Sequence, residues 1–111
     1  MRTLSFEYFI EWYMEQMSGT RMKNIKNLAE MAFSGNARLR PVLAVYAVLN
    51  GKQEKLLKYC AAYGGYGEYA DDVAWLSSGD IGELLSSDSA KPEYGKIWNT
   101  YLYKRVDTPH G

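Results

Sequence analysis

The stretch that decides the fold is the apolar run ARLRPVLAVYAVLNG, which extends from Ala37 to Gly51. Its valines, leucines and alanines cover nearly every side of a helix, a pattern typical of a helix that other helices surround. Pro41 fits within the first turn, where its missing N–H is harmless. Asn50 and Gly51 are typical of a helix end. We therefore predict a central helix over this stretch.

The segments on both sides repeat apolar residues at the three- and four-residue spacing of amphipathic helices. The predicted helices run from a cap at Thr3 or Ser5 to Ser18–Gly19, from Thr20 to Phe33, from Lys52 to Tyr63, from Tyr66 to Leu76 and from Pro92 onward, with a short helical turn at Asp80–Leu85. No stretch alternates apolar and polar residues long enough to indicate a strand. The sequence thus predicts an all-α fold, a compact irregular bundle of five to six short helices joined by tight glycine-containing turns.

The length of 111 residues fits one domain. We expect a single helical domain over residues 1–106 and a flexible tail over residues 107–111. The longest apolar run, Val42 to Leu49, is too short to cross a membrane. Glutamates interrupt the N-terminal segment, which therefore lacks the apolar core of a signal peptide. The single cysteine, Cys60, is compatible with a reducing compartment, so we expect a soluble cytoplasmic protein.

Three glycines and three tyrosines lie within YGGYGEY, the stretch from Tyr63 to Tyr69. A dinucleotide loop would need a third glycine where Ala70 stands and a strand before it, and the acids that follow would repel phosphates. A platform that stacks bases is an alternative, because aromatic rings recur every third residue. We interpret the stretch as a glycine-closed corner between two helices, with its rings packed inward.

Charge is unevenly distributed along a chain whose formal net charge is zero. Residues 20–58 carry eight bases against two acids, whereas residues 59–93 carry seven acids against one base. These segments have net charges of +6 and −6. Such an asymmetry can steer a charged partner toward the protein.

The usual ingredients of a catalytic site are missing. The one histidine, His110, lies in the expected tail, and Cys60 lies within a helix among apolar neighbours. One cysteine and one histidine are too few ligands for a zinc site. We therefore predict a non-enzymatic protein, with no catalytic residue, no cofactor and no metal site. A carboxylate-metal enzyme is the alternative, with ligands drawn from Glu7, Glu11 and Glu15 or from Glu68, Asp71 and Asp72.

The ten tyrosines and three tryptophans favour a role in protein–protein binding, because such side chains suit interfaces. We predict a small regulator or inhibitor, of the antitoxin or anti-defence type, that binds another protein; a second copy of the chain is an alternative partner. The predicted contact residues are Trp12, Arg38, Arg40, Glu68, Asp71, Asp72, Trp75 and Tyr103.

A nucleic-acid-binding module is the second hypothesis, because a basic segment can bind the phosphate backbone. Its predicted contact residues are Arg21, Lys23, Lys26, Arg38, Arg40, Lys52, Lys55 and Lys58. A helix-turn-helix reading is weaker, because the helix after the turn at Ser34–Asn36 is almost wholly apolar and has little surface left to read bases.

Overall fold

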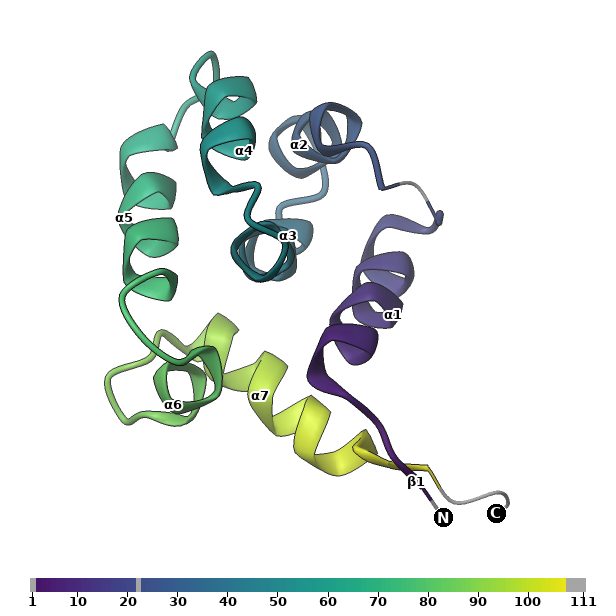
Figure 1. Cartoon of the computed structure of the whole chain (residues 1–111). Helices are drawn as coiled ribbons and strands as arrows, with labels where there is room; N and C mark the ends of the chain where they lie inside the picture. The colour runs from purple at the N-terminus through teal and green to yellow at the C-terminus, as the bar shows by residue number, and fades with distance from the viewer. Residues whose placement is uncertain (1, 22, 108–111) are drawn as a thin grey trace.

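The structure is a computed structural model, which describes residues 2–21 and 23–107 (Figure 1). The helices in these residues are α1 (Phe6–Ser18), α2 (Ile25–Ser34), α3 (Leu39–Leu49), α4 (Gln53–Cys60), α5 (Tyr66–Leu76), α6 (Ile81–Ser86) and α7 (Pro92–Lys104). The predicted all-α fold is confirmed. Seven helices form in the described residues rather than five or six, because Asp80 caps a complete helix where only a turn was predicted: its carboxylate accepts a hydrogen bond from the Glu83 N–H. No helix in residues 2–21 and 23–107 is long and apolar enough to span a membrane.

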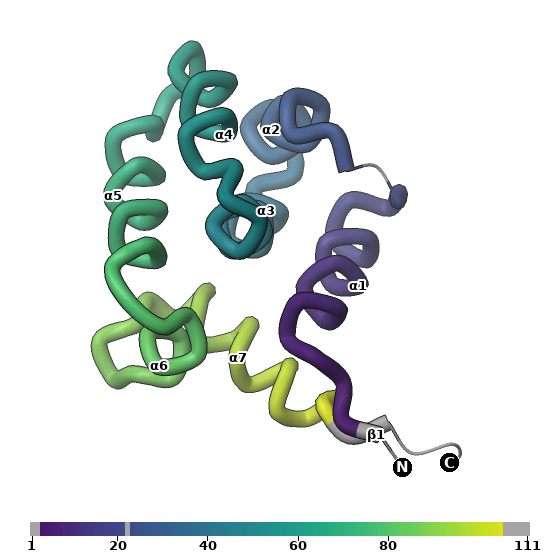
Figure 2. Tube along the Cα trace, viewed as in Figure 1, coloured from purple at the N-terminus to yellow at the C-terminus, as the bar shows by residue number. Residues whose placement is uncertain are grey.

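The central position predicted for the apolar run is confirmed. Every side chain from Val42 to Ala47 is buried, and Leu39 is fully buried at the start of α3. The helix packs against α1, α2, α4, α5 and α7 (Figure 2). A helix that is apolar nearly all round is therefore covered on nearly all sides.

The prediction that no strand forms was wrong at the two chain ends. Two-residue strands β1 (Arg2–Thr3) and β2 (Val106–Asp107) pair antiparallel, with Arg2 opposite Asp107 and Thr3 opposite Val106. Two residues are too few to show a periodic pattern in sequence, so only the fold brings them together. Asp107, the first residue of the predicted tail, thus lies in β2, while residues 108–111, His110 included, lie outside the described residues.

Caps set the helix boundaries. The Ser5 hydroxyl accepts from the Tyr8 N–H and begins α1 as predicted, and Gly19 ends it with φ of 74°. The prediction for α2 started too early, at Thr20, because Asn24 is the residue whose side chain caps that helix by accepting from the Asn27 N–H.

The corner formed by Tyr63–Tyr69 only partly matches its interpretation. Tyr63 stacks on Phe33 at 5.2 Å between ring centroids, and Tyr69 meets the same ring edge-on at 5.4 Å. The inward packing was wrong for Tyr66, which is 36% exposed. This residue opens α5 beside the glycine loop, where it makes no ring contact with another described residue.

Gly65 has φ of 84°, a conformation that L side chains adopt only with strain. We expect Gly65→Ala to lower the free energy of unfolding by about 1 kcal/mol, although nothing would crowd the new Cβ. Urea denaturation of the variant measures this change. The control is Gly64→Ala, which also has open space but no positive φ. Equal losses in both variants would contradict the argument from backbone strain.

Candidate binding cleft

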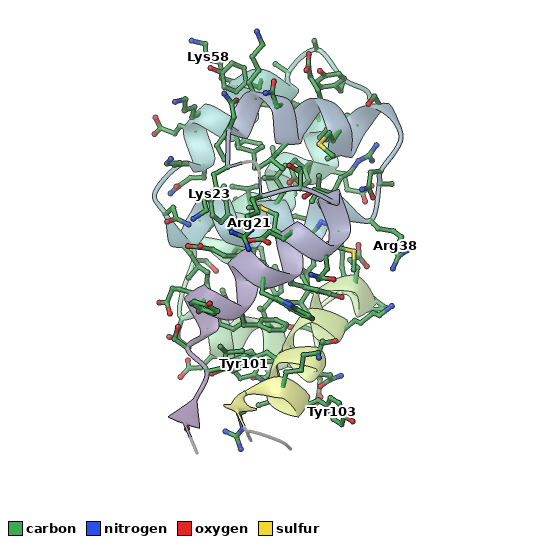
Figure 3. All side chains as sticks on the ribbon, turned by 90° about the vertical axis from the view of Figure 1, so that its right-hand side faces the viewer. Arg21, Lys23, Arg38, Lys58, Tyr101 and Tyr103 are labelled. Carbon is green, nitrogen blue, oxygen red and sulfur yellow. The ribbon has the colours of Figure 1, made fainter. Side chains whose placement is uncertain are left out.

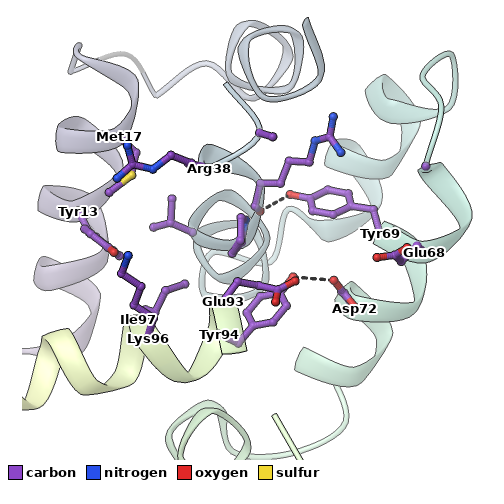
Figure 4. A pocket seen from close by; sticks show the side chains of 15 residues that line it. Tyr13, Met17, Arg38, Glu68, Tyr69, Asp72, Glu93, Tyr94, Lys96 and Ile97 are labelled. Atoms are coloured by element: carbon purple, nitrogen blue, oxygen red, sulfur yellow. Dashed lines mark hydrogen bonds between the residues drawn. The ribbon is translucent and has the colours of Figure 1, made fainter. Parts of the chain in front are cut away.

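Four helices, α1, α3, α5 and α7, surround a cleft of about 400 Å³ (Figure 4). All four contribute aromatic or apolar residues to its lining: Tyr13 and Met17 of α1, Pro41 and Val42 of α3, Tyr69 of α5, and Tyr94 and Ile97 of α7. Helices α1, α5 and α7 are far apart in sequence. They meet at the cleft because each of them packs on α3. The result is a hollow with an apolar floor that could receive an apolar side chain.

Charged side chains of both signs surround this floor. Arg38 and Lys96 extend toward α1, close to Tyr13 and Met17, whereas Glu68 and Asp72 lie on the α5 side (Figure 4). Glu93 of α7 adds a third carboxylate to the lining. Basic and acidic groups therefore lie mainly on opposite sides of the cleft, an arrangement that would orient a bound partner.

Arg40 is held in place by contacts within the protein. Its Nε donates to the Ala32 carbonyl oxygen at 2.9 Å, and its guanidinium carbon lies 4.1 Å from the centre of the Phe33 ring. The backbone carbonyl of Arg40 in turn accepts a hydrogen bond from the buried Tyr69 hydroxyl at 2.8 Å. Arg40 thus joins α2, α3 and α5 and shapes the cleft wall more than it offers a free charge.

Asp72 is also held by hydrogen bonds. Its Oδ2 accepts from the Tyr94 hydroxyl at 3.0 Å, and its Oδ1 accepts from Lys91 Nζ at 2.8 Å. Burial and the nearby Asp72 carboxylate raise the pKa of Tyr94, so its hydroxyl remains a donor. The hydrogen bond to Asp72 raises the pKa of Lys91, whose ammonium also lies 3.5 Å from Glu68. The acidic side of the cleft is therefore ordered before any partner binds.

The structure brings four of the eight predicted protein-contact residues to this one cleft. They are Arg38, Arg40, Glu68 and Asp72. The other four predicted residues do not line it and are distributed as follows. Trp12 is partly buried under Lys104, Trp75 is partly buried with its ring edge-on to Tyr94, Asp71 is exposed on α5, and Tyr103 is 87% exposed on α7.

Several residues of the cleft lining were not among the predicted contact residues. They are Tyr13 and Met17, which are half-buried, Tyr94 and Ile97, which are buried, and Lys96, which is exposed. Helical spacing identifies the face that turns inward but cannot locate where neighbouring helices diverge and leave a hollow between them. The spacing in sequence therefore held no signal for these positions.

The eight predicted nucleic-acid contacts do not form one surface. Arg38 and Arg40 line the cleft, whereas Lys23 and Lys58 lie away from Arg38 (Figure 3). The side chain of Arg21 is exposed, and its Nε lies 3.6 Å from Oε1 of Glu15. A net charge of +6 along the sequence thus divides into separate groups in space.

The carboxylate-metal alternative requires a cluster of ligands. Within residues 2–21 and 23–107, no three His, Cys, Asp or Glu side chains lie close enough together to hold a metal ion. Burial of Cys60 raises the pKa of its thiol to about 11, so the thiol stays protonated at neutral pH.

The chain matches no protein-family model, no curated protein and no solved structure.

Proposed function

We propose that the protein is a non-enzymatic regulator or inhibitor that works by binding another protein through this cleft. The observation that carries the proposal is the convergence of Arg38, Glu68 and Asp72 on one hollow that apolar side chains also line. Arg38 and Glu68 lie 30 positions apart in the sequence. Helix packing brings Arg38 to one side of the cleft, and Glu68 and Asp72 to the other (Figure 4).

The cleft suits a partner segment with one apolar side chain between groups of opposite charge. The apolar side chain would contact Tyr13, Met17 and Pro41, the half-buried residues of the lining. An acid of the partner would face Arg38 and Lys96, and a base would face Glu68 and Glu93. Buried apolar contact supplies most of the affinity in such interfaces, while charged rims set orientation and association rate.

The test uses the protein as bait with variants that reverse one side of the cleft at a time. One variant carries Arg38→Glu and Lys96→Glu, and a second carries Glu68→Lys and Glu93→Lys. All four side chains are exposed, so we expect each variant to keep the wild-type melting temperature within a few degrees. Arg40 is left unchanged because its contacts support the fold.

We expect a protein retained by wild type to lose at least about tenfold in affinity in both cleft variants, since like charges would then face each other. The matched control is Lys58→Glu with Arg105→Glu, two exposed bases outside the cleft lining, and it should bind like wild type. A partner that binds wild type and both cleft variants equally would overturn the assignment of the interface.

We also propose that the protein acts in the cytoplasm. The support is its single cysteine, which is fully buried and needs no oxidising environment for a structural role. Fractionation of cells that express the untagged protein tests this, and recovery of the protein outside the cytoplasmic fraction would contradict it.

A further inference from the structure

A second hollow, of about 290 Å³, lies between the start of α2 and the start of α4. Four lysines and one tyrosine dominate its lining, and we call it the lysine pocket: Lys23, Lys26, Lys52, Lys55 and Tyr59. It shares no lining residue with the cleft. The two hollows are therefore separate places on the surface.

Most of the charge in the lysine pocket is uncompensated. Lys23 Nζ lies 2.9 Å from Glu11 Oε1, and this hydrogen bond raises the pKa of Lys23. Lys26, Lys52 and Lys55 are exposed and make no ion pair with another described residue. The described lining of the pocket contains no carboxylate. Three ammonium groups thus share one concave surface without a protein counter-charge.

The backbone adds positive potential at the same place. The lining includes Asn24 and Ile25, where α2 begins, and Lys52, where α4 begins. The first turn of α2 has no acidic residue, and no side chain caps α4. Glu54 stands in the first turn of α4 but does not line the pocket. Asn24 caps α2 by accepting from the Asn27 N–H, whereas α4 has no side-chain cap, and the dipoles of both helices add positive potential beside the lysines.

Tyr59 gives the pocket an aromatic surface. Its side chain is only partly buried, and it makes no hydrogen bond or ring contact with another described residue. The other half-buried rings in this part of the fold differ: Tyr63 stacks on Phe33. Tyr59 packs against the core and leaves part of its side chain exposed beside the lysines. Basic side chains that pair with phosphates and an aromatic ring that stacks on a nucleobase are the combination that holds single-stranded nucleic acid.

We propose that the lysine pocket binds single-stranded nucleic acid. Lys26, Lys52 and Lys55 contact successive phosphates, and Tyr59 stacks on a nucleobase. A duplex fits this surface less well, because its bases are already stacked on each other and cannot use the tyrosine ring. The pocket thus narrows the nucleic-acid hypothesis from the whole 20–58 segment to four lysines and Tyr59.

The experiment is fluorescence anisotropy with labelled single-stranded oligothymidine and oligouridine and with a mixed-sequence duplex. Three phosphate contacts predict a slope of about −2 for log K against log salt concentration, which is roughly a twentyfold loss of affinity between 50 and 200 mM salt. We expect the single strands to bind more tightly than the duplex at each salt concentration.

Two sets of variants locate the site. Changing Lys26, Lys52 and Lys55 together to Gln should abolish the salt-dependent binding. The matched control changes Arg38, Lys96 and Arg105 to Gln, which removes the same charge from exposed positions outside the pocket and should leave binding unchanged within about twofold. Tyr59→Leu should weaken binding by about tenfold, whereas Tyr59→Phe, which keeps the ring, should not.

Any of three results would overturn the proposal. The first is absence of single-strand binding at 50 mM salt by wild type with an unchanged circular dichroism spectrum. The second is equal loss of binding in the pocket variant and in its control, which would reveal dependence on net charge alone. The third is duplex binding as tight as single-strand binding, together with equal affinities for Tyr59→Leu and Tyr59→Phe.

Discussion

Phe9→Ala is expected to lower the free energy of unfolding by about 3 to 5 kcal/mol. Phe9 is fully buried on α1. Its ring lies 5.4 Å from that of Tyr13 and 5.4 Å from that of Tyr101 on α7, so it joins the first helix to the last. The truncation removes this apolar area and leaves a cavity that rigid neighbouring rings cannot fill.

Urea denaturation followed by circular dichroism measures the loss. Tyr103→Ala is the matched control, because it also removes an aromatic ring but from a position that is 87% exposed. We expect that control to change the free energy of unfolding by less than about 0.5 kcal/mol. A loss below about 1 kcal/mol for Phe9→Ala would show that the α1–α7 contact does not form in solution.

Alkaline pH is expected to destabilise the protein, starting near pH 9. Burial raises the pKa of Cys60 from 9.0 to about 11, while the unfolded chain keeps the ordinary value. Between these values the unfolded state loses its proton first, so it binds fewer protons than the folded state and stability falls as pH rises. Two pKa units correspond to about 2 kcal/mol lost by pH 11.

Tyr69 and Tyr94 act in the same direction, because burial raises the pKa of each above 10.0. Their contribution begins about one pH unit above that of Cys60. Cys60→Ala separates the two effects: between pH 8 and 10 its unfolding free energy should fall by about 1 kcal/mol less than that of wild type. Urea denaturation at several pH values measures the difference, and parallel curves for the two proteins would contradict burial of the thiol.

The sequence predicted the helices best where caps and apolar spacing agree. Helix α5 has the predicted bounds, Tyr66–Leu76, because Gly65 precedes it and its buried residues follow one face. The predicted start of α2, at Thr20, was wrong. Thr20 and Asn24 are both acceptable capping residues, and only the fold selects Asn24. A helix, α6, forms where only a short turn was predicted, and a Cβ added to its Gly82 would lie 3.1 Å from the Trp98 ring of α7. Glycine therefore permits α6 to approach α7 rather than interrupting the helix.

The cleft and the lysine pocket were less accessible from the sequence. Both depend on which helix ends meet, and residues such as Lys26 and Lys55 become neighbours only when α2 packs on α4. Charge counting found the basic segment but could not separate Arg38, at the cleft, from these lysines. Aromatic content likewise suggested an interface without distinguishing Trp75, whose ring packs on Tyr94, from exposed Tyr103.

The pairing of β1 with β2 holds the beginning and the end of the described chain at one pole of the molecule, while α2 and α4 lie at the other (Figure 1). A protein fused through either strand would be tethered at that single pole. Immobilised in this way, the molecule would present the α2–α4 end outward to the surrounding solution. An attachment made through β1 or β2 should therefore leave the lysine pocket accessible, whichever strand carries it.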